Sequence, residues 1–176
     1  QLSNYLSTDH RMVVGTDISM NSLMLAQAFK NKFNLSHSNH FQMNVFRPCF
    51  RPESFHVTIS NGVLHHTTDP KEGLKVLATL TKKGGYVVLG LYHRFGRLIT
   101  DIRRSIFRYC GDRLSFLDSR MSQLGDKQRN AWFLDQYRNP HESKHTIQEV
   151  CGWLEEFDLH FIRSIPSNYF GPHVNS

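Results

Sequence analysis

The chain has 176 residues, of which 39% are hydrophobic and 20% charged, and it carries a formal net charge of +6. This composition excludes a disordered, collagen-like or low-complexity chain and predicts a single compact domain. No apolar run approaches the roughly 20 residues of a membrane helix, and the first residues lack the layout of a signal peptide. We therefore expect a soluble protein.

The positive charge and the cysteines give two further expectations. Much of the excess charge lies in one stretch, which contains Arg94, Arg97, Arg103, Arg104, Arg108 and Arg113. The simpler interpretation is a solvated helix face, and the alternative is a site for an anionic ligand. The three cysteines, Cys49, Cys110 and Cys151, are far apart and lack a C-x-x-C spacing. This favours a reducing, cytoplasmic environment over a disulfide framework or a zinc ribbon.

The first half of the chain alternates helices and strands. Residues 2–6 predict the remainder of a helix, and Ser19 is the expected cap of a helix whose core face holds Leu23, Ala26, Phe29 and Phe33. The expected strands are 12–17, 41–45 and 55–60.

In the second half, Asp69 is expected to cap a helix that buries Leu74, Leu77 and Leu80. Residues 83–85 should end that helix, and 86–91 predict a strand. The stretch from Arg94 to about Tyr137 has only helical signals, such as 98–109 and 126–134. Thr146 is the expected cap of the next helix, and 161–165 predict a last strand. The alternation predicts a mainly parallel α/β sheet with helices on both faces.

Polar residues follow three of the predicted strands. Asp17 ends the first strand, where an acid accepts both hydroxyl hydrogens of a ribose in nucleotide-binding sheets. Asn44, in the second, is placed to meet an adenine edge. The stretch 60–66, with His65 and His66, leaves the third strand in a Gly-containing turn. Ligands of open α/β sheets bind at this carboxyl edge.

In their order and spacing, these residues resemble the class I S-adenosylmethionine-dependent methyltransferases of the small-molecule type. The resemblance runs from Gln1 to about Ile165 and is carried by residues 15–19, 44–45, 55–66 and 80–89. It implies a Rossmann-like fold and S-adenosylmethionine as cofactor. The cofactor-binding positions it implies are Asp17, Ile18, Asn44, Val45 and Asn61. His56 departs from the family pattern, which often has Asp at that position.

The resemblance also implies that part of the sheet is absent from this chain. In the family, a central first strand and a G-x-G-x-G loop precede the helix that residues 1–6 continue, so we expect an N-terminally truncated fragment. The expected organisation is a single domain over 1–176, with its core in 1–93 and 141–176 and a helical insertion at about 94–140. The fragment itself is expected to bind cofactor poorly.

The implied reaction is an in-line displacement of the sulfonium methyl by an unidentified acceptor, most simply a small molecule, and the arginine stretch would suit an anionic one. The candidates for a general base are His65, His66, Tyr137 and His141. Residues 141–145 match the zinc-protease pattern H-E-x-x-H, but Asn139-Pro140 before it and the Thr146 cap after it place it in a loop. We therefore expect no metal site.

Two other functions stay open at this stage. The missing glycine loop would suit a catalytically inactive methyltransferase-like binding module. The arginine stretch would suit a basic nucleic-acid-binding domain.

Overall fold

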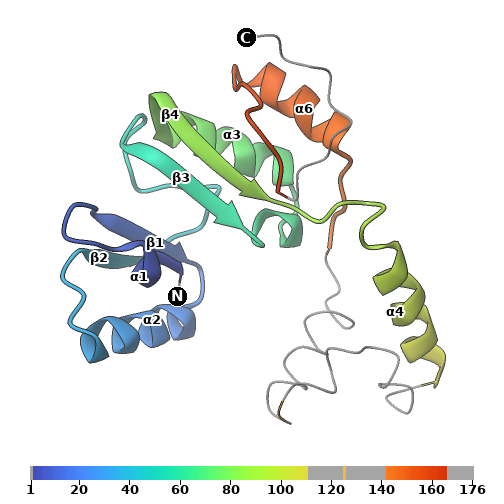
Figure 1. The fold of residues 1–176 in the computed structure, drawn as a ribbon, viewed down its shortest axis with the longest axis horizontal. Coiled ribbons are helices and arrows are strands. Elements are labelled where there is room, and N and C mark those ends of the chain that lie inside the picture. Colours follow the sequence, from blue (N-terminus) through green and yellow to red (C-terminus); the bar gives the residue numbers. More distant parts are fainter. Residues whose placement is uncertain (1, 111–124, 126–141, 166–176) are drawn as a thin grey trace. The chain divides into compact units, whose positions relative to one another are not determined.

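The computed structural model describes residues 2–110, 125 and 142–165, which contain four strands and several helices (Figure 1). The α-helices and the 3-10 helix η1 are α1 (Leu2–Leu6), α2 (Met20–Lys32), η1 (Leu64–His66), α3 (Pro70–Leu80), α4 (Leu98–Cys110) and α6 (Ile147–Glu156). The strands are β1 (Val13–Asp17), β2 (Ser38–Gln42), β3 (Phe55–Asn61) and β4 (Thr81–Gly90). The chain divides into two compact units, residues 1–58 with 79–87 and residues 59–78 with 88–176.

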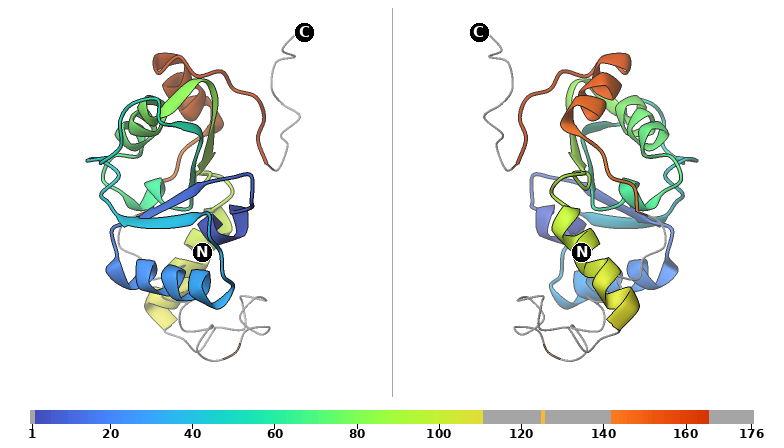
Figure 2. Two further views of the ribbon diagram at one scale, coloured as in Figure 1. Left: turned by 90° about the vertical axis from the view of Figure 1, so that its left-hand side faces the viewer. Right: turned by 90° about the vertical axis from the view of Figure 1, so that its right-hand side faces the viewer.

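The first unit is built on the parallel pair β1–β2, whose register runs from Val13 opposite Ser38 to Asp17 opposite Gln42. Helix α2 packs against both strands (Figures 1 and 2). The Ser19 side chain caps α2 by accepting a hydrogen bond from the Ser22 N–H, as the sequence predicts. The helix buries Leu23 and Ala26, whereas Phe33 at its end is more than half exposed.

Helix α1 is tied to this unit by polar contacts. The buried Asn4 side chain donates a hydrogen bond to the Ala26 carbonyl of α2 at 2.9 Å. Ser3 Oγ lies 3.2 Å from His40 Nε2, and a Cβ on Gly15 would come within 2.7 Å of that same Oγ. Glycine in β1 therefore lets the helix lie directly against the strand.

The second unit has its apolar core where α3 meets η1. Leu64 and Leu74 are completely buried, and Leu77 is nearly so. Asp69 Oδ1 accepts a hydrogen bond from the Glu72 N–H, which confirms the predicted cap of α3. At α6 the Thr146 side chain accepts from the Glu149 N–H, and the Glu149 carboxylate accepts from the Thr146 N–H in return. This reciprocal capping box fixes the predicted start of α6.

The second sheet is the pair β3–β4. The hydroxyls of Thr58 and Thr81 are buried and lie 2.8 Å apart, so these two polar side chains satisfy each other between the strands. Beyond β3, the Gly62 N–H donates to the Gly90 carbonyl at 3.2 Å. No described strand joins this pair to β1–β2.

Most expected elements are present, with three differences. Strand β2 lies at Ser38–Gln42 rather than 41–45. Strand β4 begins directly after α3, so α3 ends before Lys83, and Gly84 and Gly85 lie inside β4. Gly84 has φ of +74°, and the missing Cβ of Gly85 leaves room for the His56 carbonyl. The predicted strand at 161–165 is wrong. These residues are not in a strand, and Ile162 and Ile165 are largely exposed.

Some expectations concern residues outside the described part of the chain. These are the helix at 126–134, the catalytic candidates Tyr137 and His141, and the chain after residue 165.

Two helical glycines allow a matched test of the core of the second unit. A Cβ on Gly73 in α3 would lie 2.6 Å from Leu64, which is too buried to swing away, whereas a Cβ on Gly152 in α6 would meet nothing within 4 Å. We expect Gly152→Ala to raise the free energy of unfolding by about 0.5–1 kcal/mol through helix propensity. Gly73→Ala should lower it by about 1–3 kcal/mol through overpacking. Urea denaturation of both variants measures the difference, and equal effects would show that the Leu64 contact is unimportant.

Candidate functional site

In the first unit, two of the predicted cofactor positions lie at the same edge of the β1–β2 pair. Asp17 ends β1, and its carbonyl accepts a hydrogen bond from the Met43 N–H at 3.0 Å. The Gln42 side chain donates to the Ile18 carbonyl at 3.0 Å. Because the strands are parallel, both carboxyl ends meet at this edge, which brings Asp17 close in register to Asn44.

The side chains at this edge retain hydrogen-bonding capacity and apolar surface. Asp17 Oδ1 accepts from the Ser19 N–H at 2.8 Å, which holds the carboxylate in place and leaves its second oxygen for another donor. Asn44 Oδ1 accepts from the Phe46 N–H at 2.9 Å, so its amide hydrogens stay available. Ile18 is 67% exposed. A carboxylate, an amide and an exposed apolar side chain at one sheet edge can together bind a ligand that has both hydroxyl groups and a flat apolar part.

In the second unit, Asn61 ends β3, and His65 and His66 follow in the turn that the sequence singles out. The two histidines differ. His65 is 1% exposed, and its ring stacks on Tyr92 with 3.8 Å between centroids, while His66 is only partly buried. Within the described part of the chain, neither ring nitrogen of His65 has a hydrogen-bond partner. His65 is thus a core residue, and His66 is the more accessible of the pair.

Burial lowers the pKa of His65 from 6.5 to about 4, and the neighbouring His66 adds to this effect. The Glu142 carboxylate acts in the opposite direction without reversing the shift. A neutral imidazole fits the stack, because the hydration that a cation would lose here outweighs the stabilisation of the charged form by the Gly90 backbone and the Glu142 charge. His65 is therefore uncharged at neutral pH.

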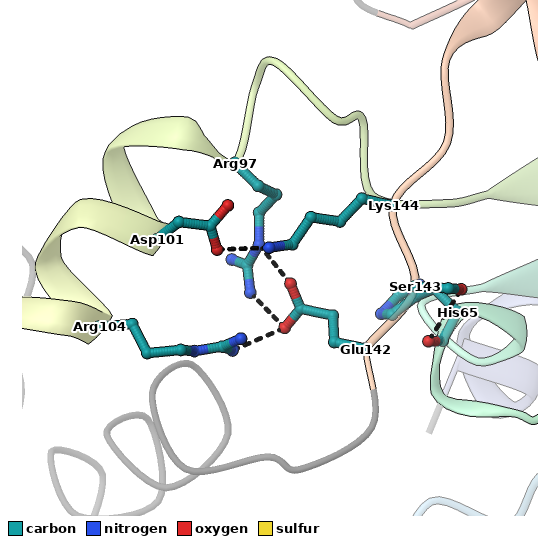
Figure 3. Close-up of polar contacts among 7 residues, drawn as sticks. All are labelled: His65, Arg97, Asp101, Arg104, Glu142, Ser143 and Lys144. Carbon is teal, nitrogen blue, oxygen red and sulfur yellow. Dashed lines mark hydrogen bonds and ion pairs between the residues drawn. The ribbon is translucent and has the colours of Figure 1, made fainter. Parts of the chain in front are cut away.

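Next to this turn, an ion cluster joins α4 to the segment 142–145 (Figure 3). Glu142 Oε1 accepts from Arg97 Nε at 3.0 Å, and Oε2 accepts from Arg97 Nη2 at 2.8 Å and from Arg104 Nη2 at 2.9 Å. The Lys144 ammonium pairs with the Asp101 carboxylate. Burial alone would raise the pKa of Glu142, but the hydrogen bonds and charges of the two arginines outweigh it and lower the pKa.

This cluster changes the interpretation of two sequence features. Arg97, directly before α4, and Arg104, within α4, both bind Glu142, so in this structure they are bound to an internal carboxylate rather than exposed on a solvated face. Glu142 is the glutamate of the H-E-x-x-H match, and residues 142–146 precede α6, outside any helix, as expected. Within the described ranges, no group of three or more histidine, cysteine or acidic side chains could hold a metal ion.

The sequence reasoning did not find Tyr92, Glu142 or Ser143. Tyr92 follows β4, and the Ser143 N–H and hydroxyl both donate to the His65 carbonyl, at 2.8 and 3.2 Å. Their partners lie 27 to 78 positions away, so no local pattern marks them. The one available signal was the excess of arginines in and before α4, which implies an acidic partner elsewhere.

Among the helices that the structure describes, none is long and apolar enough to cross a membrane.

The lowered pKa of His65 makes stability depend on pH. Since the unfolded chain protonates near pH 6.5 and the folded one only near pH 4, the contribution of His65 is complete above pH 6.5 and is lost as the pH falls through this window. Between pH 7.5 and 5.5, wild type should lose about 1 kcal/mol more unfolding free energy than His65→Phe, which keeps the stack but cannot titrate. Urea denaturation at both pH values tests this. The exposed His10→Phe should retain the wild-type slope, and an equal slope in His65→Phe would refute the assignment.

The sequence and the fold resemble those of known proteins. Residues 1–89 match the family model described as a methyltransferase domain. Solved structures with a similar fold include PKMT2 from Rickettsia typhi, at a TM-score of 0.66 and 12% identity over 82% of this chain and 33% of that one. The YcgJ protein from Bacillus subtilis gives a TM-score of 0.54 at 13% identity, over 82% of this chain and 50% of that one.

Among curated proteins, an uncharacterized protein of Synechococcus sp. is 26% identical over 85% of this chain, and the match covers 42% of that relative. The chain thus spans about half or less of the length of these proteins. The family match covers half of the chain, and the fold is the α/β fold of the class I methyltransferases, which confirms the resemblance found in the sequence. The chain therefore belongs to the methyltransferase domain family.

Proposed function

We propose that this domain transfers the methyl group of S-adenosylmethionine to a small-molecule acceptor. The observation that carries the proposal is the edge of the β1–β2 pair, where the Asp17 carboxylate is held by the Ser19 N–H with one oxygen remaining. The cofactor, when bound, supplies an electrophilic methyl group on a sulfonium. The residues of the chain then have to bind and orient the cofactor and the acceptor and to exclude water. A dedicated catalytic base is optional.

The roles follow from the side chains present. Asp17 would accept the two ribose hydroxyl hydrogens, and the exposed Ile18 would pack on the adenine ring with Val45. The Asn44 amide would donate to an adenine ring nitrogen, because its carbonyl oxygen already accepts from Phe46. Asn61, the last residue of β3, lies in the second unit and remains a cofactor-binding candidate from the sequence.

For the acceptor side, the structure favours His66 over His65 as the group that would take a proton. His65 is buried, and its lowered pKa makes it a weak base. The acceptor can be neutral or anionic. If it is anionic, it would have to compete with Glu142 for Arg97 and Arg104. Tyr137 and His141 remain candidates from the sequence.

Calorimetric titration of the natural full-length protein with S-adenosylmethionine tests the proposal. Asp17→Asn retains an oxygen for the Ser19 N–H but loses the charge and one acceptor, so binding should weaken by at least about tenfold, the scale of a lost charge-assisted hydrogen bond. Asp9→Asn is the matched control, because Asp9 is an exposed acid of the same unit and should leave the affinity unchanged. Equal affinities of wild type and Asp17→Asn would reject the ribose assignment.

A further inference from the structure

Three segments that are distant in sequence are joined by backbone hydrogen bonds in the second unit. The Ser143 N–H donates to the His65 carbonyl at 2.8 Å, and the His145 N–H donates to the Tyr92 carbonyl at 3.0 Å. The Arg94 N–H in turn donates to the His145 carbonyl at 3.0 Å. The segment 143–145 is therefore attached both to the turn after β3 and to the residues after β4.

Glu142, directly before this segment, joins it to α4 as well. Its side chain is 2% exposed and accepts three hydrogen bonds from Arg97 and Arg104 (Figure 3). A buried carboxylate with these partners resists separation from them, because either side would be left as an uncompensated charge. Arg97 directly precedes α4 and Arg104 lies in its second turn, so one carboxylate holds the start of the helix and a point farther along it.

Arg97 also extends this contact to His65. The guanidinium carbon of Arg97 lies 3.9 Å from the centre of the Tyr92 ring, and the Tyr92 ring also contacts the rings of His65 and His66. The Glu142 carboxylate, the Arg97 guanidinium, the Tyr92 ring and the His65 imidazole thus form one continuous series of contacts. This series runs in parallel with the backbone hydrogen bonds from Ser143.

We propose that Glu142 and Arg97 are positioning residues, which together hold α4 and the His65–His66 turn as one rigid acceptor-side body. The coupling between α4 and the His65–His66 turn follows from the contacts alone. Only the assignment of this body to the acceptor side rests on the proposed function. Glu142 fixes Arg97, Arg97 covers Tyr92, and Tyr92 keeps His65 enclosed. His66, the partly buried neighbour of His65, contacts the same two rings, those of His65 and Tyr92.

The His65 imidazole reports on this coupling, since its pKa depends on how completely it is enclosed. The titratable and charged groups around it are His66 on its own turn, Tyr92 after β4, Arg97 before α4 and Glu142 in the returning segment. Removing the negative charge of Glu142 without any movement would lower the pKa of His65 further, because that charge raises it. Opening of the stack would raise the pKa toward 6.5. The two effects have opposite signs.

The experiment is an NMR titration of the His65 ring in the natural full-length protein, for which His65→Phe identifies the resonance. We expect Glu142→Gln to raise the pKa of His65 by at least about one unit. The matched control is Glu156→Gln, which removes the exposed Lys71–Glu156 ion pair of the same unit and should leave the His65 pKa unchanged. An unchanged or lower pKa in Glu142→Gln would overturn the proposal.

If Glu142→Gln does not fold, Arg97→Lys gives the answer. It keeps the positive charge near His65 but loses the paired hydrogen bonds to Glu142 and the planar group over Tyr92. The His65 pKa should rise here too, and a wild-type value would overturn the proposal. The titration needs neither cofactor nor acceptor. A protein with the expected shifts that does not bind S-adenosylmethionine would therefore refute the proposed function and retain the coupling.

Discussion

The carboxylate of Glu142 is the constraint on which the arrangement of α4, the segment 142–145 and the turn after β3 depends. An ionised group that is 2% exposed is stable only while its hydrogen bonds are complete, and here both of its oxygens are occupied by arginine donors. These donors come from the residue before α4 and from α4 itself, and the next residue along the chain, Ser143, binds the His65 carbonyl. One buried charge therefore sets the relative positions of three segments that are distant in sequence.

Local chemistry explains which parts of the fold could be predicted. The starts of α2, α3 and α6 are set by Ser19, Asp69 and Thr146, whose side chains bind backbone N–H groups three residues away. Such contacts lie within one turn of helix and are therefore visible as a spacing in the sequence. The strand-end position of Asp17 was predictable for the same reason, because a short β-branched run leads directly to it.

The wrong or missing predictions concern positions whose structure is set by residues far away in the sequence. Residues 161–165 have an apolar pattern, but a strand also needs a neighbour to pair with, and the described residues supply none. Strand β4 begins at Thr81, because the Thr81 hydroxyl meets Thr58, 23 positions earlier. In the candidate site, the turn after β3 was found from its polar residues. The burial of His65 under Tyr92, and the pairing of Arg97 with Glu142 45 positions later, are tertiary contacts that leave no periodic signal.

The two-stranded sheets have a consequence for how this chain behaves in solution. In a pair, each strand has one neighbour, so β1 and β3 each present an edge that no other described strand covers. Val57 and Ile59 on β3 are 47% and 40% exposed, and neither proline nor an acidic side chain interrupts the strand. Edges of this kind accept further strands through their backbone groups, whether from the same polypeptide or from another molecule. Within the described part of the chain, these edges are therefore the places where association with a further strand would begin.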